Sequence, residues 1–340
     1  MIVTYIRSSS YGNYEFCQMQ YFMTYVLGHR SDSGKKAQQG TACHKVMECL
    51  AACKKELQQK PDDKKLIIVD DAIGEVEFTP KKLYTKKFVK DLLDRSYEHY
   101  TSMDNHRYYP ADFRFCQDQV ETAITFNDGQ FDPRNRTIVD TEPTFDIPIE
   151  QDWAKYQYEM PNGEIINGRL AIKGTIDLVT SVADDIIEVI DWKTGQRKNW
   201  ATGEVKDYNK LQKDPQLLLY NYAISKLYPN YEQAIMSIFF TRDGGPFSMC
   251  FDSADQESFL EMLRKRFEEI KANIKPKPIS EKRLDFRCQR LCHFYKNNWP
   301  GTNTTMCEYV ENKIHTIGYK EAVKECTKDG FNIGYYEAPG

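Results

Sequence analysis

Two aspartates in the segment GTIDLVTSVADDIIEVIDWK could share one catalytic site. The segment alternates with a period of two, which is typical of two neighbouring strands. A turn centred on Asp184 pairs Val182 with Ile186, and the same register places Asp177 opposite Asp191. Residues paired in this way project from one face of the sheet, roughly 5 Å apart, where two like charges are destabilising. The pattern therefore predicts a cation that compensates the two carboxylates.

Lys193 lies two residues after Asp191, so a period of two places both side chains on the same face. Two carboxylates beside an ammonium suit a hard divalent cation such as Mg²⁺ and the metal-assisted hydrolysis of a phosphodiester. Lys193 could orient or deprotonate the attacking water, or stabilise the charge that develops on the phosphate. The alternative is an exposed hairpin with scattered charges, because a change of one residue in the loop would shift the register.

Helical spacing adds three candidates. His44 follows Gly40 by about one helical turn and could be a further metal ligand, or simply a surface histidine. Gln216 and Tyr220 are spaced i, i+4, so they share one face of a helix that begins after Asp214, a residue type that caps helices. A tyrosine packed in the core is the alternative there.

The chain contains ten cysteines. In an intracellular protein thiols stay reduced, and clustered ones are typically used for metals or reactivity. Five are expected to be structural, because they lie on a helical pattern or are isolated: Cys43, Cys49, Cys53, Cys116 and Cys250. The other five lie near the two ends of the sequence.

Composition limits the class of protein. The 340 residues are 41% hydrophobic and 28% charged, which is typical of a globular chain with one large core or two smaller ones. The formal net charge of −4 excludes a histone-like polycation. No segment approaches the ~20 apolar residues that span a bilayer, and the first residues do not resemble a signal peptide. We expect a soluble, intracellular protein without a membrane partner.

Periodicity divides the chain into a helical part and a later part that contains the strands. Helices are expected over residues 14–27, 40–60, 85–103, 111–126, 214–227 and 253–274, with a link over 31–36. Strands are expected within 138–150, 156–160, 165–181, 186–193 and 234–240. The stretch 61–135 shows no evident chemistry.

Four motifs make the chain recognisable. GTACH (40–44), GTIDLV (174–179), EVIDWKTG (188–195) and QLLLY (216–220) follow one another in the order of the GxxxH, GxxD, D/ExK and QxxxY motifs. In this the chain resembles the PD-(D/E)XK nucleases, and most of all the RecB/AddB-like branch that includes CRISPR adaptation nucleases and phage exonucleases. The resemblance runs from about residue 8 to 310 and is least specific over 61–136. It implies a restriction-endonuclease-like α/β core, with a mixed sheet of four or five strands flanked by helices and a helical insertion.

The resemblance also implies roles for the motif residues. His44, Asp177, Asp191 and the backbone carbonyl of Trp192 would bind Mg²⁺ or Mn²⁺, and Lys193 would be the catalytic lysine. Gln216 and Tyr220 would contact DNA or brace the site. The expected reaction is in-line attack of water on the phosphorus.

Many members of this branch join one N-terminal and three C-terminal cysteines around a [4Fe-4S] cluster. Here the first element is Cys17, flanked by Tyr14 and Tyr21, and the second contains the cysteines Cys288, Cys292 and Cys307. Four thiolates are the usual complement of such a cluster. The spacing of the last three cysteines departs from the usual pattern, so Zn²⁺ is an alternative, with His293 or Cys326 replacing one ligand. Buried cysteines without any metal are the third possibility.

Two segments could bind DNA despite the acidic net charge. Residues 193–213 carry a charge of +4 that includes Arg197 and Lys198, with Trp200 and Tyr208 interleaved, and residues 281–300 carry +3. A basic track with aromatic side chains suits single-stranded nucleic acid. Solvated surface segments are the alternative.

The predicted organisation is a single nuclease unit over residues 1–340. Within it, 1–30 and 281–315 would hold the cysteine cofactor, 31–136 would be helical, and 137–275 would form the catalytic core. The expected function is metal-dependent cleavage of DNA, by an exonuclease acting on single strands or ends in recombination, repair or phage DNA metabolism. A non-catalytic nucleic-acid-binding subunit and a structure-specific endonuclease that trims DNA ends are the alternatives.

The cellular setting is expected from the same resemblance to be the cytoplasm of a bacterial or phage-infected cell. The sequence has no G-x-x-x-x-G-K-[ST] motif, so unwinding of a duplex would require a helicase or recombination partner.

Overall fold

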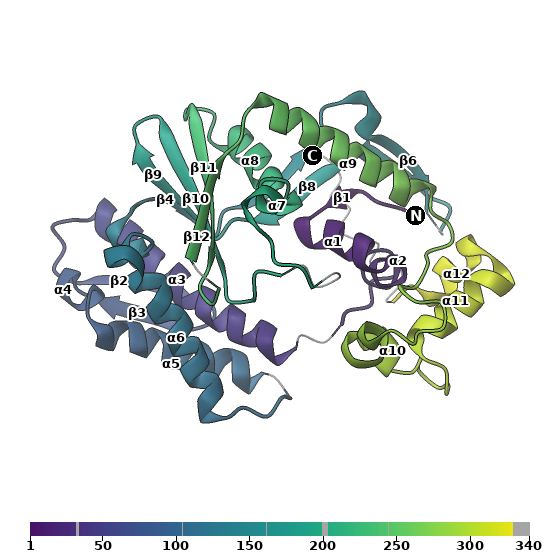
Figure 1. The fold of residues 1–340 in the computed structure, drawn as a ribbon, viewed down its shortest axis with the longest axis horizontal. Coiled ribbons are helices and arrows are strands. Elements are labelled where there is room, and N and C mark those ends of the chain that lie inside the picture. The colour runs from purple at the N-terminus through teal and green to yellow at the C-terminus, as the bar shows by residue number, and fades with distance from the viewer. Residues whose placement is uncertain (32–33, 104, 161, 199–202, 244, 329–340) are drawn as a thin grey trace. The chain divides into compact units, whose positions relative to one another are not determined.

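The computed structural model describes residues 1–31, 34–103, 105–160, 162–198, 203–243 and 245–328 (Figure 1). The chain divides into two compact units. The first comprises Met1–Asp32, Phe145–Gly174 and Ser253–Gly340, and the second comprises Ser33–Thr144 and Thr175–Asp252. Among the described residues, no helix combines the length and the apolar character that crossing a bilayer requires.

The second unit is built on a mixed sheet of five strands. Their order is β12–β11–β10–β9–β4, and only β10 and β11 run parallel (Figure 1). The strands are β4 (Thr137–Thr141), β9 (Leu178–Ala183), β10 (Ile186–Lys193), β11 (Gln233–Phe240) and β12 (Gly245–Cys250). This sheet and its flanking helices confirm the predicted α/β fold class.

Helices cover the sheet because its apolar strands expose side chains on both faces. One face packs against α3 (Lys35–Gln59), α5 (Lys86–Ser102) and α6 (Pro110–Thr125), and Ile190 and Trp192 of β10 join that core. The helix α8 (Pro215–Leu227) contacts β11 and begins where predicted. The Asp214 carboxylate caps it by accepting a hydrogen bond from the backbone N–H of Gln216. The short helix α7 (Tyr208–Gln212) precedes it.

The β9–β10 hairpin has the predicted register along most of its length. Ile187 pairs with Ser181 and Ile190 pairs with Leu178, which is the predicted register, and Asp177 lies in a bend just before the first paired residue of β9. The prediction was wrong at the tip, where Ile186 pairs with Ala183 rather than with Val182. The physical reason is a bulge between Ile186 and Ile187, which absorbs one residue beside a two-residue turn.

The helical region of this unit also differs in part from expectation. Helices α5 and α6 confirm the predictions, but α3 begins at Lys35, within the expected link. The strands β2 (Leu66–Asp70) and β3 (Gly74–Phe78) form a hairpin that was not predicted. The remaining elements are α4 (Pro80–Leu83) and the 3₁₀ turns η2 (Phe126–Gly129) and η3 (Pro133–Asn135).

The first unit contains a small sheet of order β1–β8–β5, a separate hairpin and several helices. The strands are β1 (Tyr5–Ile6), β5 (Thr144–Pro148), β6 (Lys155–Glu159), β7 (Ile165–Arg169) and β8 (Ala171–Thr175). The helical elements are α1 (Ser8–Phe16), α2 (Gln18–Tyr21), η1 (Phe22–Val26), η4 (Asp152–Ala154), α9 (Ser253–Ala272), η5 (Arg287–Leu291), α10 (His293–Lys296), α11 (Met306–Ile317) and α12 (Tyr319–Cys326). The single helix expected over residues 14–27 was wrong, because Cys17 has an extended backbone that separates α1 from α2.

Candidate active site

Asp191 and Lys193 lie at the end of β10, and Asp177 lies immediately before β9. Asp191 is 1% exposed, and the ammonium of Lys193 lies 2.6 Å from its Oδ2. The backbone N–H of Trp192 donates to Asp177 Oδ2 at 3.0 Å, which ties the two ends of the hairpin together. The structure therefore brings the two predicted carboxylates and the lysine to one end of the sheet.

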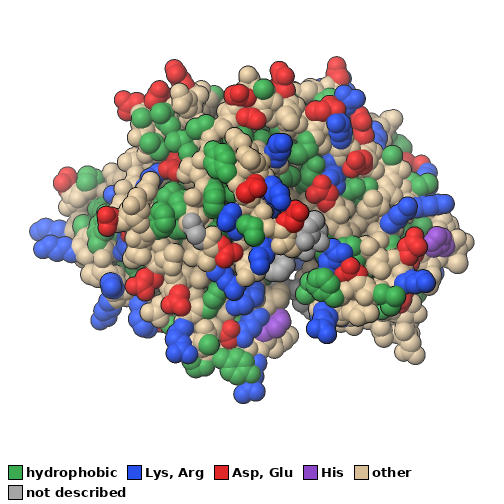
Figure 2. All heavy atoms as spheres, in the orientation of Figure 1, with side chains coloured by type: hydrophobic (Ala, Val, Ile, Leu, Met, Phe, Trp, Pro, Cys, Tyr) green, Lys and Arg blue, Asp and Glu red, His purple; other side chains and the backbone are tan. Residues whose placement is uncertain are grey.

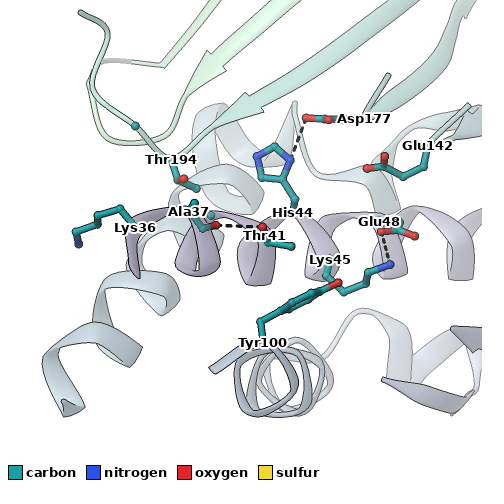
Figure 3. A pocket seen from close by; sticks show the side chains of 12 residues that line it. Lys36, Ala37, Thr41, His44, Lys45, Glu48, Tyr100, Glu142, Asp177 and Thr194 are labelled. Atoms are coloured by element: carbon teal, nitrogen blue, oxygen red, sulfur yellow. Dashed lines mark hydrogen bonds and ion pairs between the residues drawn. The ribbon is translucent and has the colours of Figure 1, made fainter. Parts of the chain in front are cut away.

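His44 reaches this site from α3. Its Nδ1 lies 3.3 Å from Asp177 Oδ2, and the two side chains point toward one another in Figure 3. Gly40 explains how the helix comes this close, because a Cβ atom there would meet the Thr194 hydroxyl at 3.0 Å. The spacing of Gly40 and His44 thus permits a close approach of α3 to the chain that follows β10.

Gln216 and Tyr220 brace the buried carboxylate from α8. The Gln216 side-chain amide donates to Asp191 Oδ1 at 2.9 Å and to the Tyr220 hydroxyl at 2.9 Å. The Tyr220 hydroxyl in turn donates to the carbonyl of Thr175 at 2.8 Å. This chain of hydrogen bonds orients Asp191, so a bracing role for the pair is supported by direct contacts.

One oxygen of Asp191 has the Lys193 ammonium as its partner. The Lys193 ammonium lies 2.6 Å from Oδ2, and no other donor among the described residues reaches this buried atom. Burial raises the pKa of Asp191 from 3.8 to about 6, and the Asp177 carboxylate adds to this while Lys193 opposes it. A buried carboxylate beside a second carboxylate is an arrangement that a further cation would stabilise.

The neighbouring groups respond to the same charges. Burial alone would raise the pKa of Asp177 and lower that of His44, but their mutual attraction reverses both directions. Burial also opposes the charge on Lys193, yet the two carboxylates raise its pKa above the ordinary value. Lys193 is therefore a cation at neutral pH.

The site opens into a pocket of about 580 Å³ beside α3 (Figure 3). Its lining includes His44 and Asp177 together with Glu48, Tyr100 and Glu142, three residues that the sequence analysis did not single out. The i, i+4 spacing of His44 and Glu48 was a signal that could have found one of them. Lys45, also on this wall, is held by Glu48 at 2.6 Å and Asp70 at 2.9 Å.

Glu142 occupies a break between β4 and β5. Its φ of 49° is uncommon for a residue other than glycine, and its N–H donates to the carbonyl of Asp177 at 3.3 Å. Burial raises the pKa of Glu142 to about 8, with Asp177 and Glu48 adding to the effect. In Figure 3 its side chain points into the same space as Asp177.

A family model for the PD-(D/E)XK nuclease superfamily matches residues 8–296, a span that includes all four motifs and this site. The chain belongs to the PD-(D/E)XK nuclease superfamily. The nuclease is accordingly a phosphodiester hydrolase. Among solved structures it is similar to a protein of Eubacterium rectale named "Putative exonuclease", with a TM-score of 0.42 and 9% identity over 90% of this chain and 92% of that chain. No curated protein sequence matches the nuclease.

The four cysteines expected at a cofactor all belong to the first unit of the nuclease. The thiols of Cys17, Cys288 and Cys292 interact electrostatically, and Cys307 interacts with Cys17 and Cys292. The Cys17 sulfur accepts a hydrogen bond from the backbone N–H of Gln20 at 3.4 Å. These cysteines, far apart in sequence, therefore gather in one place.

Neither candidate metal site is closed around an ion. Within the described ranges, no three His, Cys, Asp or Glu side chains approach closely enough to hold a metal ion as they stand. Of the two substitute ligands considered, Cys326 has Lys313 and Glu325 as its electrostatic neighbours, and His293 Nδ1 lies 3.2 Å from the Asn297 amide nitrogen.

The five cysteines of the nuclease that were expected to be structural differ in their exposure to solvent. Cys43, Cys49, Cys53 and Cys116 are buried, as a structural role requires. The exposed Cys250, at the end of β12, contradicts that expectation for its position, because the last residue of this edge strand faces solvent.

Half of the basic side chains of segment 193–213 form ion pairs with neighbouring carboxylates. Lys206 and Lys210 form ion pairs with Asp214 at 2.5 Å and Glu204 at 2.8 Å, as Lys193 does with Asp191. The guanidinium of Arg197 lies 4.7 Å from the Phe247 ring centroid and donates to the carbonyl of Lys206. Lys198 is exposed, Tyr208 is half-exposed, and Trp200 lies outside the described residues.

In the segment 281–300, two of the five basic side chains form ion pairs. Arg283 pairs with Glu311, and Arg287 pairs with Asp285 at 2.7 Å. This segment belongs to the first unit, whereas the candidate active site belongs to the second. The charge sums read from the sequence therefore overstate the free positive charge of both segments.

Proposed function

We propose that the chain is a metal-dependent deoxyribonuclease of the RecB/AddB-like branch, an exonuclease that acts on single-stranded DNA or on DNA ends. Its setting would be recombination, repair or phage DNA metabolism, with a helicase or recombination partner supplying any unwinding. The observation that carries the proposal is the convergence of His44, Asp177, Asp191 and Lys193 at one end of the sheet, where His44 and Asp177 line an open pocket.

The residues present fit a divalent cation. Asp191 offers a buried carboxylate whose charge the neighbouring Asp177 disfavours, and Asp177 and His44 supply further oxygen and nitrogen ligands. These three side chains, with the backbone carbonyl of Trp192, would hold Mg²⁺ or Mn²⁺. When bound, the ion would act as a Lewis acid on the phosphate and lower the pKa of water.

The side chains around the ion would have distinct roles. Because Lys193 stays charged, we assign it the stabilisation of negative charge on the phosphate oxygens rather than proton abstraction. Gln216 holds Asp191 in its orientation, and Tyr220 holds Gln216. Arg197 and Lys198 remain candidates for contact with the DNA backbone, with Lys198 the more accessible of the two.

The decisive experiment is digestion of end-labelled single- and double-stranded DNA with Mg²⁺, Mn²⁺ or EDTA. The expected result is metal-dependent release of short products from an end of the single strand, and no cleavage in EDTA. Products of intermediate length from an internally labelled circle would identify an endonuclease instead. Unchanged substrate length in every metal, with retained binding, would identify a non-catalytic DNA-binding subunit.

The affinity for Mn²⁺ is expected to fall as the pH decreases through about 6. The pKa of Asp191 is about 6 and that of His44 is raised, so the ion must displace protons at low pH. Each displaced proton weakens binding by about tenfold per pH unit below its pKa. Calorimetric titration of the metal-free protein between pH 5 and 7.5 measures this, and an affinity that is constant over that range would contradict the proposed ligands.

The same shift has a consequence for stability. The folded state binds the Asp191 proton more tightly than the unfolded chain, so this residue makes the metal-free protein less stable as the pH rises from about 4 to about 6. A bound cation would remove that loss.

We further propose that Cys17, Cys288, Cys292 and Cys307 bind a [4Fe-4S] cluster, with Zn²⁺ as the alternative occupant. Support comes from the proximity of the four thiols and from the amide hydrogen bond to the Cys17 sulfur, a type of contact that tunes cluster ligands. Burial raises the pKa of Cys288 to about 11 and that of Cys307 to about 12, so cluster assembly must displace thiol protons. The cluster would join distant parts of the chain within the first unit.

Anaerobic purification is expected to give a brown protein with about four irons per chain, as a [4Fe-4S] cluster requires. Cys307→Ser should lose both iron and colour and lower the thermal midpoint, because metal binding is coupled to folding. Cys250→Ser is the matched control, since its exposed thiol lies outside the group. A colourless protein that contains zinc would replace the cluster by Zn²⁺, and a metal-free protein of unchanged stability would rule out both.

A further inference from the structure

A pair of cations surrounds an aromatic ring at the start of α3 and α6. The Lys36 ammonium lies 3.9 Å from the centroid of the Phe115 ring, and the Arg242 guanidinium lies 5.9 Å from the same centroid. Lys36 belongs to the first turn of α3, Phe115 to α6, and Arg242 to the turn after β11. Three segments that are far apart in sequence thus build one basic and aromatic cluster.

The same combination occurs a second time on the neighbouring surface. The Lys35 ammonium and the Arg107 guanidinium each lie 5.1 Å from the centroid of the Tyr109 ring. Tyr109 is 50% exposed. We call the two clusters together, Lys35, Lys36, Arg107, Tyr109, Phe115 and Arg242, the α3–α6 platform.

The platform carries positive charge that the protein leaves uncompensated. Lys36, Arg107 and Arg242 are exposed, and in the described part of the chain no carboxylate lies within ion-pair distance of them. Lys35 alone has such a partner, Asp112 at 2.5 Å. Lys and Arg side chains gather where α3 begins, in the lower middle of the view in Figure 2. The platform therefore differs from segment 193–213, where half of the basic side chains form ion pairs.

The platform adjoins the candidate active site along α3. Lys36 and His44 line the same pocket, and Figure 3 shows Lys36 at one end of it and His44 near its middle. Eight residues of α-helix span about 12 Å, which is about the rise of three to four nucleotides in one strand. A strand with its scissile phosphate beside His44 and Asp177 would reach the platform within a few nucleotides.

We propose that the α3–α6 platform binds single-stranded DNA and leads it to the pocket. The inference rests on the proposed nuclease function and specifies its substrate. Phosphates would contact Lys36, Arg107 and Arg242, while unpaired bases would stack against Tyr109 and Phe115. In a duplex the bases are stacked inside, so its phosphates would contact the platform cations but its bases would not stack on the aromatic rings.

The test measures binding in EDTA in an Asp191→Asn background, so that no cleavage occurs. Fluorescence anisotropy with a labelled oligo-dT and with a duplex of equal length gives both affinities. The aromatic variant Tyr109→Leu with Phe115→Leu is expected to weaken oligo-dT binding by about tenfold or more and duplex binding by less than threefold. Tyr109→Leu alone, at a half-exposed position, gives the same direction if the double variant proves unstable.

The charge variant Lys36→Gln with Arg242→Gln is expected to weaken the binding of both oligo-dT and duplex. For oligo-dT, the slope of the logarithm of the binding constant against the logarithm of the salt concentration should become less steep by about 1.4, because two phosphate contacts are lost. Lys81→Gln with Lys87→Gln is the matched control, because it removes two exposed charges at α4 and the start of α5. If both platform variants bind oligo-dT as tightly as this control does, the proposal that the platform binds DNA is wrong. Equal losses for oligo-dT and duplex in the aromatic variant would overturn the single-strand assignment.

These outcomes are separable from failure of the proposed function. A protein that binds oligo-dT through the platform but never cleaves DNA would refute the nuclease proposal alone. A protein that cleaves DNA while its platform variants bind normally would refute the platform alone.

Discussion

Asp191→Asn is expected to lower the rate of DNA cleavage by about 10³-fold or more while leaving the protein folded. The substitution keeps the shape of the side chain and its contact with Gln216, but it removes the charge beside Lys193 and the proposed cation. Metal and electrostatic stabilisation of the transition state are each worth several kcal/mol, and every 1.36 kcal/mol is a factor of ten in rate. Single-turnover digestion of end-labelled DNA at saturating Mg²⁺ measures the loss.

Folding is checked separately, because a buried site is being changed. Burial already disfavours the charge of Asp191, so the neutral asparagine should leave the thermal midpoint of the metal-free protein unchanged or slightly raised. Asp185→Asn, in the turn of the same hairpin, is the matched control and should cleave normally. Lys193→Ala should lose activity to a similar degree. Full cleavage by the purified Asp191→Asn protein would refute the assignment of the site.

The β9–β10 hairpin shows why part of this site could be predicted from sequence. Register in an antiparallel pair follows from alternation and turn position, so local residues are sufficient to bring Asp177 and Asp191 to the same end of the hairpin. The position of the bulge at Ile186 could not be predicted, since it depends on the geometry of the turn. The placement of His44 and Gln216 needed the family resemblance, because helices α3 and α8 reach the sheet through tertiary packing.

The residues that the sequence did not indicate depend on long-range contacts. Glu142 lines the pocket because its backbone has a positive φ between β4 and β5, and no local sequence pattern predicts that conformation. Phe115 lies in a stretch without evident chemistry, and its partners Lys36 and Arg242 are distant in the chain. Charge sums over a segment also fail where an ion pair such as Lys206–Asp214 neutralises part of it.

Arg136→Ala is expected to lower the free energy of unfolding by about 3–5 kcal/mol, the usual cost of leaving a buried charge without its partner. Glu188 of β10 is 6% exposed, and its carboxylate pairs with the Arg136 guanidinium. Arg136 also donates to the Thr180 hydroxyl at 3.1 Å, and the other carboxylate oxygen of Glu188 accepts from Ser237 at 2.5 Å. Without Arg136 these neutral hydroxyls cannot compensate the carboxylate.

The expected loss of unfolding free energy comes from the unpaired Glu188 carboxylate and not from lost packing of Arg136. A second substitution distinguishes these two causes. Glu188→Gln in the Arg136→Ala background removes that charge and should recover a large part of the stability, because a neutral amide is far less costly to bury. Lys90→Ala is the matched control: its ammonium pairs with Asp94 at 2.6 Å on an exposed face of α5, so the loss should stay within about 0.5 kcal/mol. Urea unfolding followed by circular dichroism measures all four proteins. A loss below 1 kcal/mol in Arg136→Ala, or no recovery in the double variant, would show that the Glu188 carboxylate is not held by this pair.

Glu188 and Asp191 are three residues apart on β10, so their side chains lie on opposite faces of the sheet. The Arg136–Glu188 pair should therefore affect stability without changing the chemistry at Asp191.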